Sequence, residues 1–451
     1  MFSFKAAALF LTGVVLLLPG MAHSQELLTL EEAVRIGLQN NYDIRIADRQ
    51  ESIAENNVTL GNAGFLPTVQ GRLNRDFANN DTRNQFNSME PRIVNNSKSN
   101  TLNTGAFLNW TVFDGGQMFI NYDRLKALEA SGDLLTKSTV ETTMADIITA
   151  YYEVVRQAQK IEALKEAIAI SQERIDVTQA QYEVGVSAKV EILRAQVDFN
   201  ADRSELLLQE ELLQNAKITL NQLLARDPVE DFRVVDTIIV DQDVFIETVA
   251  PDLVAANPTL KRFQVERELA LLDLRAARAL RYPSVSVNGG YGLVRNIQEP
   301  AFFGEIVGTS ENRRLGFSYG LGISLPLFNG FEVNRLTQNA KLQLETSTIA
   351  YQQTQNRLLS ELSRAYSQYT NRLKLLSLEE SNVKLAQENA AIALERYKLG
   401  LLTAIELREA QRNELVAANR LIDIKYQAKA AEVELKRLSS TLVSEGPVPA
   451  E

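Results

Sequence analysis

One stretch of the sequence occurs twice. The letters YEVGVSAKVEILRAQ begin at Tyr182, and the related letters YKLGLLTAIELREAQ begin at Tyr397, which is 215 residues later. Each copy places one glycine between two runs of helical character and ends in Ala-Gln. The sequence therefore predicts an internal duplication, with structural repeats over residues 25–240 and 241–441, each built from a helix, two strands and two long helices.

The N-terminus has the pattern of a secretory signal. Lys5 is followed by a 13-residue apolar run, by the breaker pair Pro19-Gly20, and by small residues at positions 22 and 24. Thirteen apolar residues are too few for a membrane-spanning helix, which needs roughly 20. Residues 1–24 are therefore predicted to be a cleaved signal peptide that exports the chain. Residues 442–451 are expected to form a flexible C-terminal tail.

The composition argues against several classes of function. The chain has no cysteine and one histidine, His23, which lies in the signal. The mature chain therefore has no disulfide, no His-dependent triad and no ordinary zinc site. Its net charge is −10, and −11 without Lys5, so a nucleic-acid partner is not expected. We predict no enzyme activity and no cofactor.

Two very long helices are expected. Residues 117–183 contain no proline and one glycine, Gly132, so they can form one helix of roughly 100 Å. Residues 331–397 repeat this pattern. The helix expected over 188–225 has apolar residues at seven-residue spacing, the seam of a coiled coil: Ile192, Phe199, Leu206, Leu213 and Leu220.

Alternating apolar and polar residues predict strands at 68–74, 102–113, 284–294 and 316–327. A polar loop over 77–100 is expected to be exposed and mobile. The last strand is the clearest, and its apolar face is expected to meet lipid: Phe317, Tyr319, Leu321, Ile323 and Leu325. About ten alternating residues suit a transmembrane strand. Four strands cannot close a barrel, and open edges are not tolerated in hydrocarbon, so three chains giving twelve strands are predicted.

In this order, the duplicated strand–strand–helix–helix pattern, the Phe-Asp-Gly and Phe-Asn-Gly exits at 113–115 and 328–330, and the repeated glycine corners resemble the TolC-like outer-membrane efflux proteins. The resemblance covers essentially all of the mature chain. It implies a homotrimer whose 12-stranded barrel, with four strands per chain, continues into a coiled-coil α-helical barrel. It places the protein in the outer membrane and extends it into the periplasm.

The same resemblance assigns functional residues. The helix corners are expected to dock a periplasmic adaptor through Val184, Gly185, Val186, Leu399, Gly400 and Leu401. Glu406 and Glu409 fall where the family narrows its pore with acidic residues. Glu191 and Tyr397 fall where the family pairs an acid with a tyrosine as a latch, although the expected basic partner is replaced by Leu402.

These features together predict a passive exit duct for efflux or type I secretion, with a periplasmic adaptor and an inner-membrane pump as partners. A periplasmic coiled-coil adaptor or scaffold is the main alternative, and it leaves the four amphipathic strands unexplained. A soluble hydrolase has no nucleophile and base in the sequence to support it.

Overall fold

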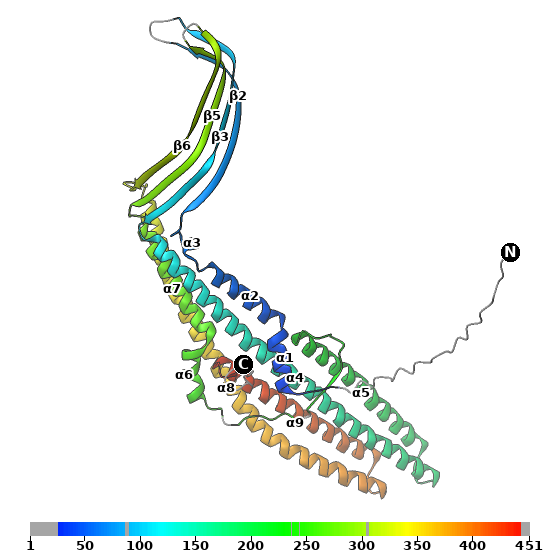
Figure 1. Ribbon diagram of the computed structural model, residues 1–451. Coiled ribbons are helices and arrows are strands. Elements are labelled where there is room, and N and C mark those ends of the chain that lie inside the picture. The colour runs from blue at the N-terminus through cyan, green and yellow to red at the C-terminus, as the bar shows by residue number, and fades with distance from the viewer. Residues whose placement is uncertain (1–25, 86–89, 236, 243, 304–305, 443–451) are drawn as a thin grey trace, which may run out of the picture.

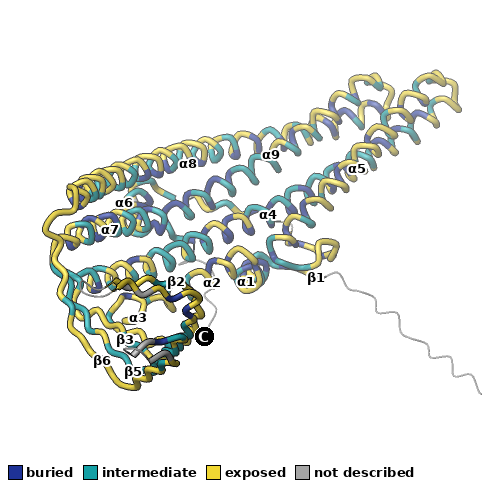
Figure 2. The backbone as a smooth tube through the Cα atoms, turned by 90° about the horizontal axis from the view of Figure 1, so that it is seen from above, coloured by how far each residue is buried: buried dark blue, intermediate teal, exposed yellow. Residues whose placement is uncertain are grey.

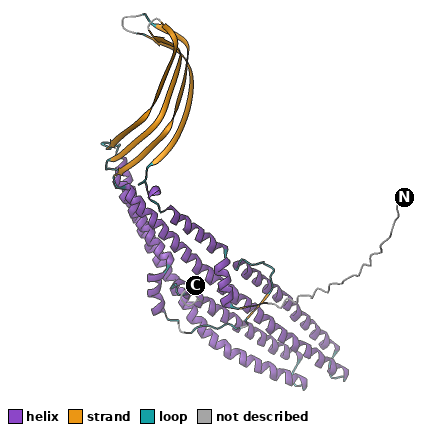
Figure 3. Ribbon diagram, in the orientation of Figure 1, coloured by secondary structure: helices purple, strands orange, loops and turns teal. Residues whose placement is uncertain are grey.

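The computed structural model describes residues 26–85, 90–235, 237–242, 244–303 and 306–442. The predicted signal peptide, and residues 443–451 of the predicted tail, lie outside these residues. Leu442, the first residue of that tail, is 6% exposed and packs in a core, so the prediction of a flexible tail is wrong at this residue. A curved four-stranded sheet stands at one end of a long bundle of helices (Figure 1), and two short strands, β1 (Glu26–Leu28) and β4 (Phe232–Val234), pair in parallel within the helical part (Figure 3).

The elements repeat in order along the chain. The first repeat contains β1 (Glu26–Leu28), α1 (Leu30–Asn40), α2 (Tyr42–Asn57), α3 (Leu60–Ala63), β2 (Thr68–Asn84), β3 (Arg92–Asp114), α4 (Gln117–Glu183), α5 (Lys189–Leu223) and β4 (Phe232–Val234). The second contains α6 (Ile246–Ala256), α7 (Pro258–Ala279), β5 (Ser284–Phe303), β6 (Ile306–Ser324), α8 (Glu332–Lys398) and α9 (Ala404–Leu438).

The two long helices confirm the sequence prediction. α4 has the predicted bounds, and α8 is displaced by one residue; each contains 67 residues. Their central parts form an apolar core in each repeat, the first with α5 and the second with α9, and buried positions run along all four helices (Figure 2); α9 also gives Val433 to the first core. Ile147 and Leu220 are fully buried in the first core, and their equivalents 215 residues later, Leu362 and Leu435, are buried in the second.

One asparagine in each repeat sets the break between the two short helices that precede the sheet. The Asn41 side chain caps α2 and donates to the carbonyl of Leu223 at the end of α5 (2.8 Å). The Asn257 side chain caps α7 and donates to the carbonyl of Leu438 at the end of α9 (3.0 Å). Each asparagine therefore links a break between two helices to the end of a hairpin. Both side chains are buried, and these hydrogen bonds give their polar atoms the partners that buried polar groups need.

The sheet is antiparallel, in the order β2-β3-β5-β6, so the hairpins of the two repeats join through β3 and β5. Among the described residues, β2 pairs only with β3, and β6 pairs only with β5. The sheet of one chain therefore ends in two unpaired edges.

The prediction of a mobile polar loop over residues 77–100 is wrong in part. β2 continues to Asn84 and β3 begins at Arg92, so most of this segment is paired hairpin. The pairing extends through Phe77↔Asn100 to Asn84↔Arg92, with an irregularity between Asn80 and Thr82. Val94 is the one apolar side chain that is buried among the described residues of this segment. Backbone hydrogen bonding therefore continues here without the alternation of apolar and polar residues that marks a half-buried strand.

The chain leaves the sheet and enters each long helix through left-handed backbone. Before α4, Gly115 and Gly116 have φ values of +74° and +90°. Before α8, Gly330 and Phe331 have φ values of +61° and +62°. The second glycine of the first exit is thus replaced by Phe331 in the second, in a conformation that costs a residue with a Cβ of order 1 kcal/mol.

Candidate functional site

The first hairpin turns through a defined backbone motif at its tip. After α4, the Gly185 N–H donates to the carbonyl of Tyr182 (2.9 Å), and the Val186 N–H donates to that of Gln181 (2.9 Å). These two bonds form a Schellman motif, in which the residue after the helix has left-handed backbone. Gly185 has this conformation, with a φ of +80°.

The second hairpin repeats the motif. After α8, the Gly400 N–H donates to Tyr397 (3.0 Å) and the Leu401 N–H donates to Arg396 (2.8 Å). The φ of Gly400 is +71°. A Cβ at either glycine would meet no other atom, so backbone conformation rather than space requires glycine here.

Apolar side chains project from both tips. Val184 and Val186 are each 75% exposed, and Leu399, Leu401 and the neighbouring Ile405 are also exposed. The two tips lie at the same end of the molecule, far from the sheet (Figure 1). Exposed apolar groups gathered on an ordered turn are typical of a contact surface. These are the residues predicted to dock an adaptor, and that role stays a prediction.

Glu406 lies in the first turn of α9, where it completes a capping box with Thr403. Its carboxylate accepts from the Thr403 N–H (2.9 Å) and hydroxyl (2.7 Å), while its own N–H donates to that hydroxyl (3.3 Å). Hydrogen bonds from the side chain and backbone of Thr403 hold the pKa of the Glu406 carboxyl below its ordinary value. The predicted gate residue is therefore an ionised helix cap in one chain.

Glu191 is the repeat equivalent of Glu406, 215 residues earlier, but it has a different partner. It forms an ion pair with Arg194 (2.8 Å) three residues further along α5. The repeat equivalent of Arg194 is Glu409, so the arginine of the first repeat becomes the second predicted gate acid. The two hairpin tips therefore differ in charge although their backbones match.

The Tyr397 side chain joins the two hairpins. It is 4% exposed, and its hydroxyl lies 2.7 Å from that of Thr178 on α4. The Thr178 hydroxyl donates its proton to the Arg174 carbonyl (2.7 Å), so the tyrosine hydroxyl is the donor. Within one chain, the predicted latch partners are thus engaged separately, Tyr397 with Thr178 and Glu191 with Arg194. Their pairing between neighbouring hairpins stays a prediction.

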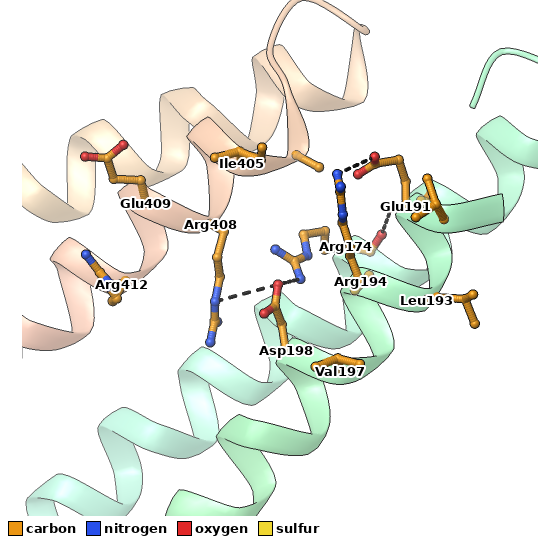
Figure 4. Close-up of a pocket in the computed structure, with 14 residues that line it drawn as sticks. Arg174, Glu191, Leu193, Arg194, Val197, Asp198, Ile405, Arg408, Glu409 and Arg412 are labelled. Carbon is orange, nitrogen blue, oxygen red and sulfur yellow. Dashed lines mark hydrogen bonds and ion pairs between the residues drawn. The ribbon is translucent and has the colours of Figure 1, made fainter. Parts of the chain in front are cut away.

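A groove of about 870 Å³ opens between the hairpins near the tips, where α4, α5 and α9 meet (Figure 4). Its wall combines apolar side chains, such as Leu193 and Ile405, with charged ones of both signs. The groove brings Glu191 and Glu409 into one lining. Its arginines come from all three helices: Arg174, Arg194, Arg408 and Arg412.

Two of these arginines form a polar network that the sequence analysis missed. Arg408 on α9 makes a bidentate ion pair with Asp202 on α5 (2.7 and 2.9 Å), and Ser171 on α4 donates to the same carboxylate (2.6 Å). Arg174, which is 2% exposed, forms an ion pair with Asp198 one turn along α5. The hydrogen bond to Asp202 raises the pKa of the Arg408 guanidinium. The network therefore fixes α9 of one hairpin against the other hairpin.

The same region corrects the predicted seam of α5. The apolar positions from Ile192 to Leu220 form only half of it, because a second set three residues later is buried throughout, whereas Phe199, Leu206 and Leu213 of the first set are only half-buried. That second set includes Asp202 and Gln209, which hydrogen-bonds to Gln157 of α4. A polar layer in a coiled coil selects one register at some cost in stability. A seven-residue spacing of Ala195, Asp202 and Gln209 was the available signal.

Four of the residues predicted to face lipid, Phe317, Tyr319, Leu321 and Ile323, share one face of the sheet, whereas Leu325 lies beyond β6, which ends at Ser324 rather than at the predicted residue 327. Tyr319 pairs across β5 with Gly289, and Leu321 pairs with Val287, so directly opposite residues lie on the same side. The apolar face continues across all four strands, as in the row Leu73, Thr104, Leu293 and Leu315. The five predicted residues are all exposed in the single chain: Phe317, Tyr319, Leu321, Ile323 and Leu325.

The opposite face is polar and rich in glycine. It includes the row Arg72, Gly105, Gly292 and Gly316, and the row Asn74, Asn103, Val294 and Arg314. No helix in the described part of the chain is long and apolar enough to cross a membrane. Nor do the described residues contain a group of three or more His, Cys, Asp or Glu side chains placed to hold a metal ion.

Comparison with known proteins places these features in a family. A family model described as outer membrane efflux protein matches the chain twice, over residues 34–226 and 249–441. The probable efflux pump outer membrane protein TtgC of Pseudomonas putida is 21% identical over 411 residues, covering 90% of this chain and 81% of that protein. The alkaline protease secretion protein AprF of Pseudomonas aeruginosa is 22% identical over 437 residues, covering 92% and 87%.

Among solved structures, the Campylobacter jejuni CmeC outer membrane channel has a TM-score of 0.76 and 18% sequence identity. The likeness covers 91% of this chain and 85% of that one. At this identity, the comparison shows that the two chains share a fold.

Proposed function

Because the chain belongs to the outer membrane efflux protein family, we propose that three copies form one passive exit duct, served by a periplasmic adaptor and an inner-membrane pump. The protein is an outer-membrane channel whose helical part extends into the periplasm. The number of copies, the docking contacts and the gate are the proposed parts.

The unpaired sheet edges are the observation that carries the trimer. β2 and β6 each have one free edge, and an unpaired peptide group in hydrocarbon costs several kcal/mol. Pairing β6 of one chain with β2 of the next removes both edges. Three chains give twelve strands, an even number that leaves room for a wet lumen. The polar, glycine-rich face would then line the lumen, and the apolar face would meet lipid.

The hairpin tips support the adaptor and pump as partners. Each chain offers two matched turns with exposed apolar side chains, so a trimer would present six at one mouth. TtgC is named for an efflux pump and AprF for protease secretion, which are both tasks of multi-component exporters. We propose the same kind of assembly for this protein. Efflux and type I secretion are both compatible with it.

Cysteine cross-linking tests the shared barrel, and the chain has no native cysteine to interfere. Leu73→Cys on β2 is combined in turn with a cysteine at each outward position of β6 from 311 to 319. At least one pair is expected to link subunits into a covalent trimer in the outer-membrane fraction. Cysteines at Thr104 and Leu293, which are paired within one chain, are the matched control and should give no trimer band.

Single-channel recording completes the test. The purified protein in planar bilayers is expected to conduct ions, as an open-ended duct must. A periplasmic adaptor or scaffold would give neither conductance nor cross-links between β2 and β6. The proposal is rejected if no cysteine pair links subunits while the Thr104–Leu293 control forms.

A further inference from the structure

One row of the sheet carries arginine on three of its four strands. Arg75 of β2 is paired with Leu102 of β3, Leu102 with Arg295 of β5, and Arg295 with Arg313 of β6. Directly opposite residues project to the same face. Counting along β6 by twos from Leu321 to Arg313 places the three guanidinium groups on the apolar face of the sheet.

The arginine row lies near the outer border of the apolar band, and the row beyond it mixes apolar and polar residues: Phe77, Asn100, Ile297 and Glu311. The next row toward the helices is Leu73, Thr104, Leu293 and Leu315, and apolar residues continue down β6 to Ile323. From Arg313 to Ile323 the strand rises roughly 34 Å, or about 25 Å along the membrane normal at the usual tilt. This is the height of the apolar band of an outer-membrane barrel. The arginine row lies further from the helices than Leu73 and Leu315, because β2 begins at Thr68 after α3 and β6 ends at Ser324 before α8.

The charges on this border are mostly positive and accessible. Arg75, Arg295 and Arg313 are all exposed. Glu311, one row further out on the same face, neutralises part of the charge through an ion pair with Arg295 (2.6 Å). Arg75 donates to Asn100 (3.2 Å), which uses one of its five donors. Three arginines and one glutamate leave a net charge of +2 per chain.

We propose that the row of Arg75, Arg295 and Arg313 binds phosphate groups of the lipids in the outward-facing leaflet. Arginine presents a planar fork that holds a phosphate by two hydrogen bonds, and it is less strongly hydrated than lysine. A lipid whose chains cover Leu315 and Phe317 has its headgroup at this row. The inference rests on the proposed function, because only a barrel in a membrane exposes the row to lipid. A trimer would carry nine such arginines in a ring.

Lipid binding by the purified trimer tests the proposal. The probe is a fluorescent, bisphosphorylated lipid A, compared with the same lipid without its phosphates. The triple variant Arg75→Gln, Arg295→Gln, Arg313→Gln is expected to weaken binding of the phosphorylated lipid at least tenfold. The matched control is Arg72→Gln with Arg314→Gln, which removes arginines next to the row on the opposite face. It should change affinity less than twofold.

Three further measurements distinguish binding of a lipid phosphate from binding of a free anion or of the lipid chains alone. The dephosphorylated lipid should bind the wild-type trimer as weakly as the phosphorylated lipid binds the triple variant. Inorganic phosphate at tens of millimolar should displace little lipid; full displacement would assign the row to a free anion and overturn the lipid assignment. Replacing the three arginines by lysine keeps the positive charge but removes the planar guanidinium groups, and it should give an intermediate affinity for the phosphorylated lipid. This lysine variant tests the proposal if the glutamine variant does not assemble.

Failure of the arginine proposal can be told apart from failure of the proposed channel function. All variants are first examined for the trimer and for single-channel conductance. A variant that assembles, conducts and binds phosphorylated lipid as tightly as wild type overturns the arginine proposal alone. A wild-type protein that forms no conducting trimer overturns the proposed function.

Discussion

The hydroxyl of Tyr397 on α8 donates a hydrogen bond of 2.7 Å to the hydroxyl of Thr178 on α4, in the buried interior between the two hairpins. The Gln181 side chain donates to the carbonyl of the same tyrosine (3.3 Å). A buried hydroxyl that loses its hydrogen-bond partner destabilises the folded chain more than an exposed hydroxyl does. This contact therefore holds the two hairpins in one relative position near the tips.

Tyr397→Phe should loosen this position. Losing one neutral hydrogen bond should lower the stability of the contact between the hairpins by about 1 kcal/mol. The conductance of the resting channel should rise, because the tips are then held less firmly. Tyr182→Phe is the matched control, because Tyr182 occupies the equivalent place in the first repeat and is exposed. Conductance of both variants is measured in planar bilayers. Equal conductance of Tyr397→Phe and wild type would show that this contact does not restrain the tips.

Arg408→Ala should destabilise the tip region more than any exposed arginine change. It leaves the Asp202 carboxylate, which is 8% exposed, without its ion pair, a loss worth roughly 3 kcal/mol. Arg412→Ala, one turn along α9 and exposed, should change little. Limited proteolysis at the tips and thermal unfolding are the measurements. The double variant Arg408→Ala, Asp202→Ala should recover part of the loss, and no recovery would argue against a buried pair.

The glycine corners should tolerate alanine better than aspartate. Gly185→Asp with Gly400→Asp is expected to abolish transport while the trimer still assembles, because charge is added to an apolar contact surface. Gly185→Ala with Gly400→Ala imposes at least as much left-handed strain, about 1 kcal/mol per site, without the charge. Adaptor cross-linking and efflux assays are compared in both. If the aspartate variant cross-links normally, the glycines serve only to cap the helices.

Glu406→Gln with Glu409→Gln tests the gate. Glutamine can complete the capping box, so this change removes the charge while keeping the helix start. Acidic rings favour cations, and the variant should therefore lose cation selectivity and block by multivalent cations. The reversal potential in a salt gradient reports selectivity. Glu406→Ala serves as the capping control, and unchanged selectivity in the glutamine variant would remove both residues from the pore lining.

Glu141 of α4 should make stability depend on pH. It is 8% exposed and accepts from Ser440 (3.2 Å), with Arg437 and Lys261 nearby, and burial raises its pKa to about 7. Because the folded chain binds this proton more tightly than the unfolded chain does, stability should fall as pH rises from about 4.5 through 7. Glu141→Gln should therefore raise the melting temperature at pH 8, with a gain of up to about 3 kcal/mol in the free energy of unfolding. At pH 4 the same change should leave the melting temperature nearly unaltered.

The control for this prediction lies on the same helix. Glu162 is exposed and forms an ion pair with Lys165 at the surface (2.8 Å). Glu162→Gln should give the same small change in melting temperature at both pH values. A Glu141→Gln effect that is equal at pH 4 and pH 8 would contradict the buried-charge explanation.

The long helices and the two turns could be predicted because their signals are local. The absence of proline over 117–183 and the single glycine at each corner report directly on backbone conformation. The strand ends could not be predicted in the same way. Apolar alternation stops near Phe77, where the strand no longer needs an apolar face, but its hydrogen bonds continue to Asn84.

The polar network near the tips depends on distant partners. The seven-residue spacing of Ala195, Asp202 and Gln209 could indicate that Asp202 is buried, but nothing in the sequence of α5 reveals that Ser171 and Arg408 complete its hydrogen bonds. The arginine row is similar: Arg75, Arg295 and Arg313 are far apart in the chain, and only the register across four strands aligns them.

The strand exits have a mechanical consequence. A helix of 67 residues is a lever of about 100 Å, so a rotation of about 3° where it leaves the sheet moves its far end by about 5 Å. The pivot of α4 is a pair of glycines, whereas the pivot of α8 includes Phe331, whose side chain restricts the backbone. We therefore expect the two levers of one chain to differ in stiffness at their fixed ends, so that equal forces on the two tips swing the first hairpin further than the second.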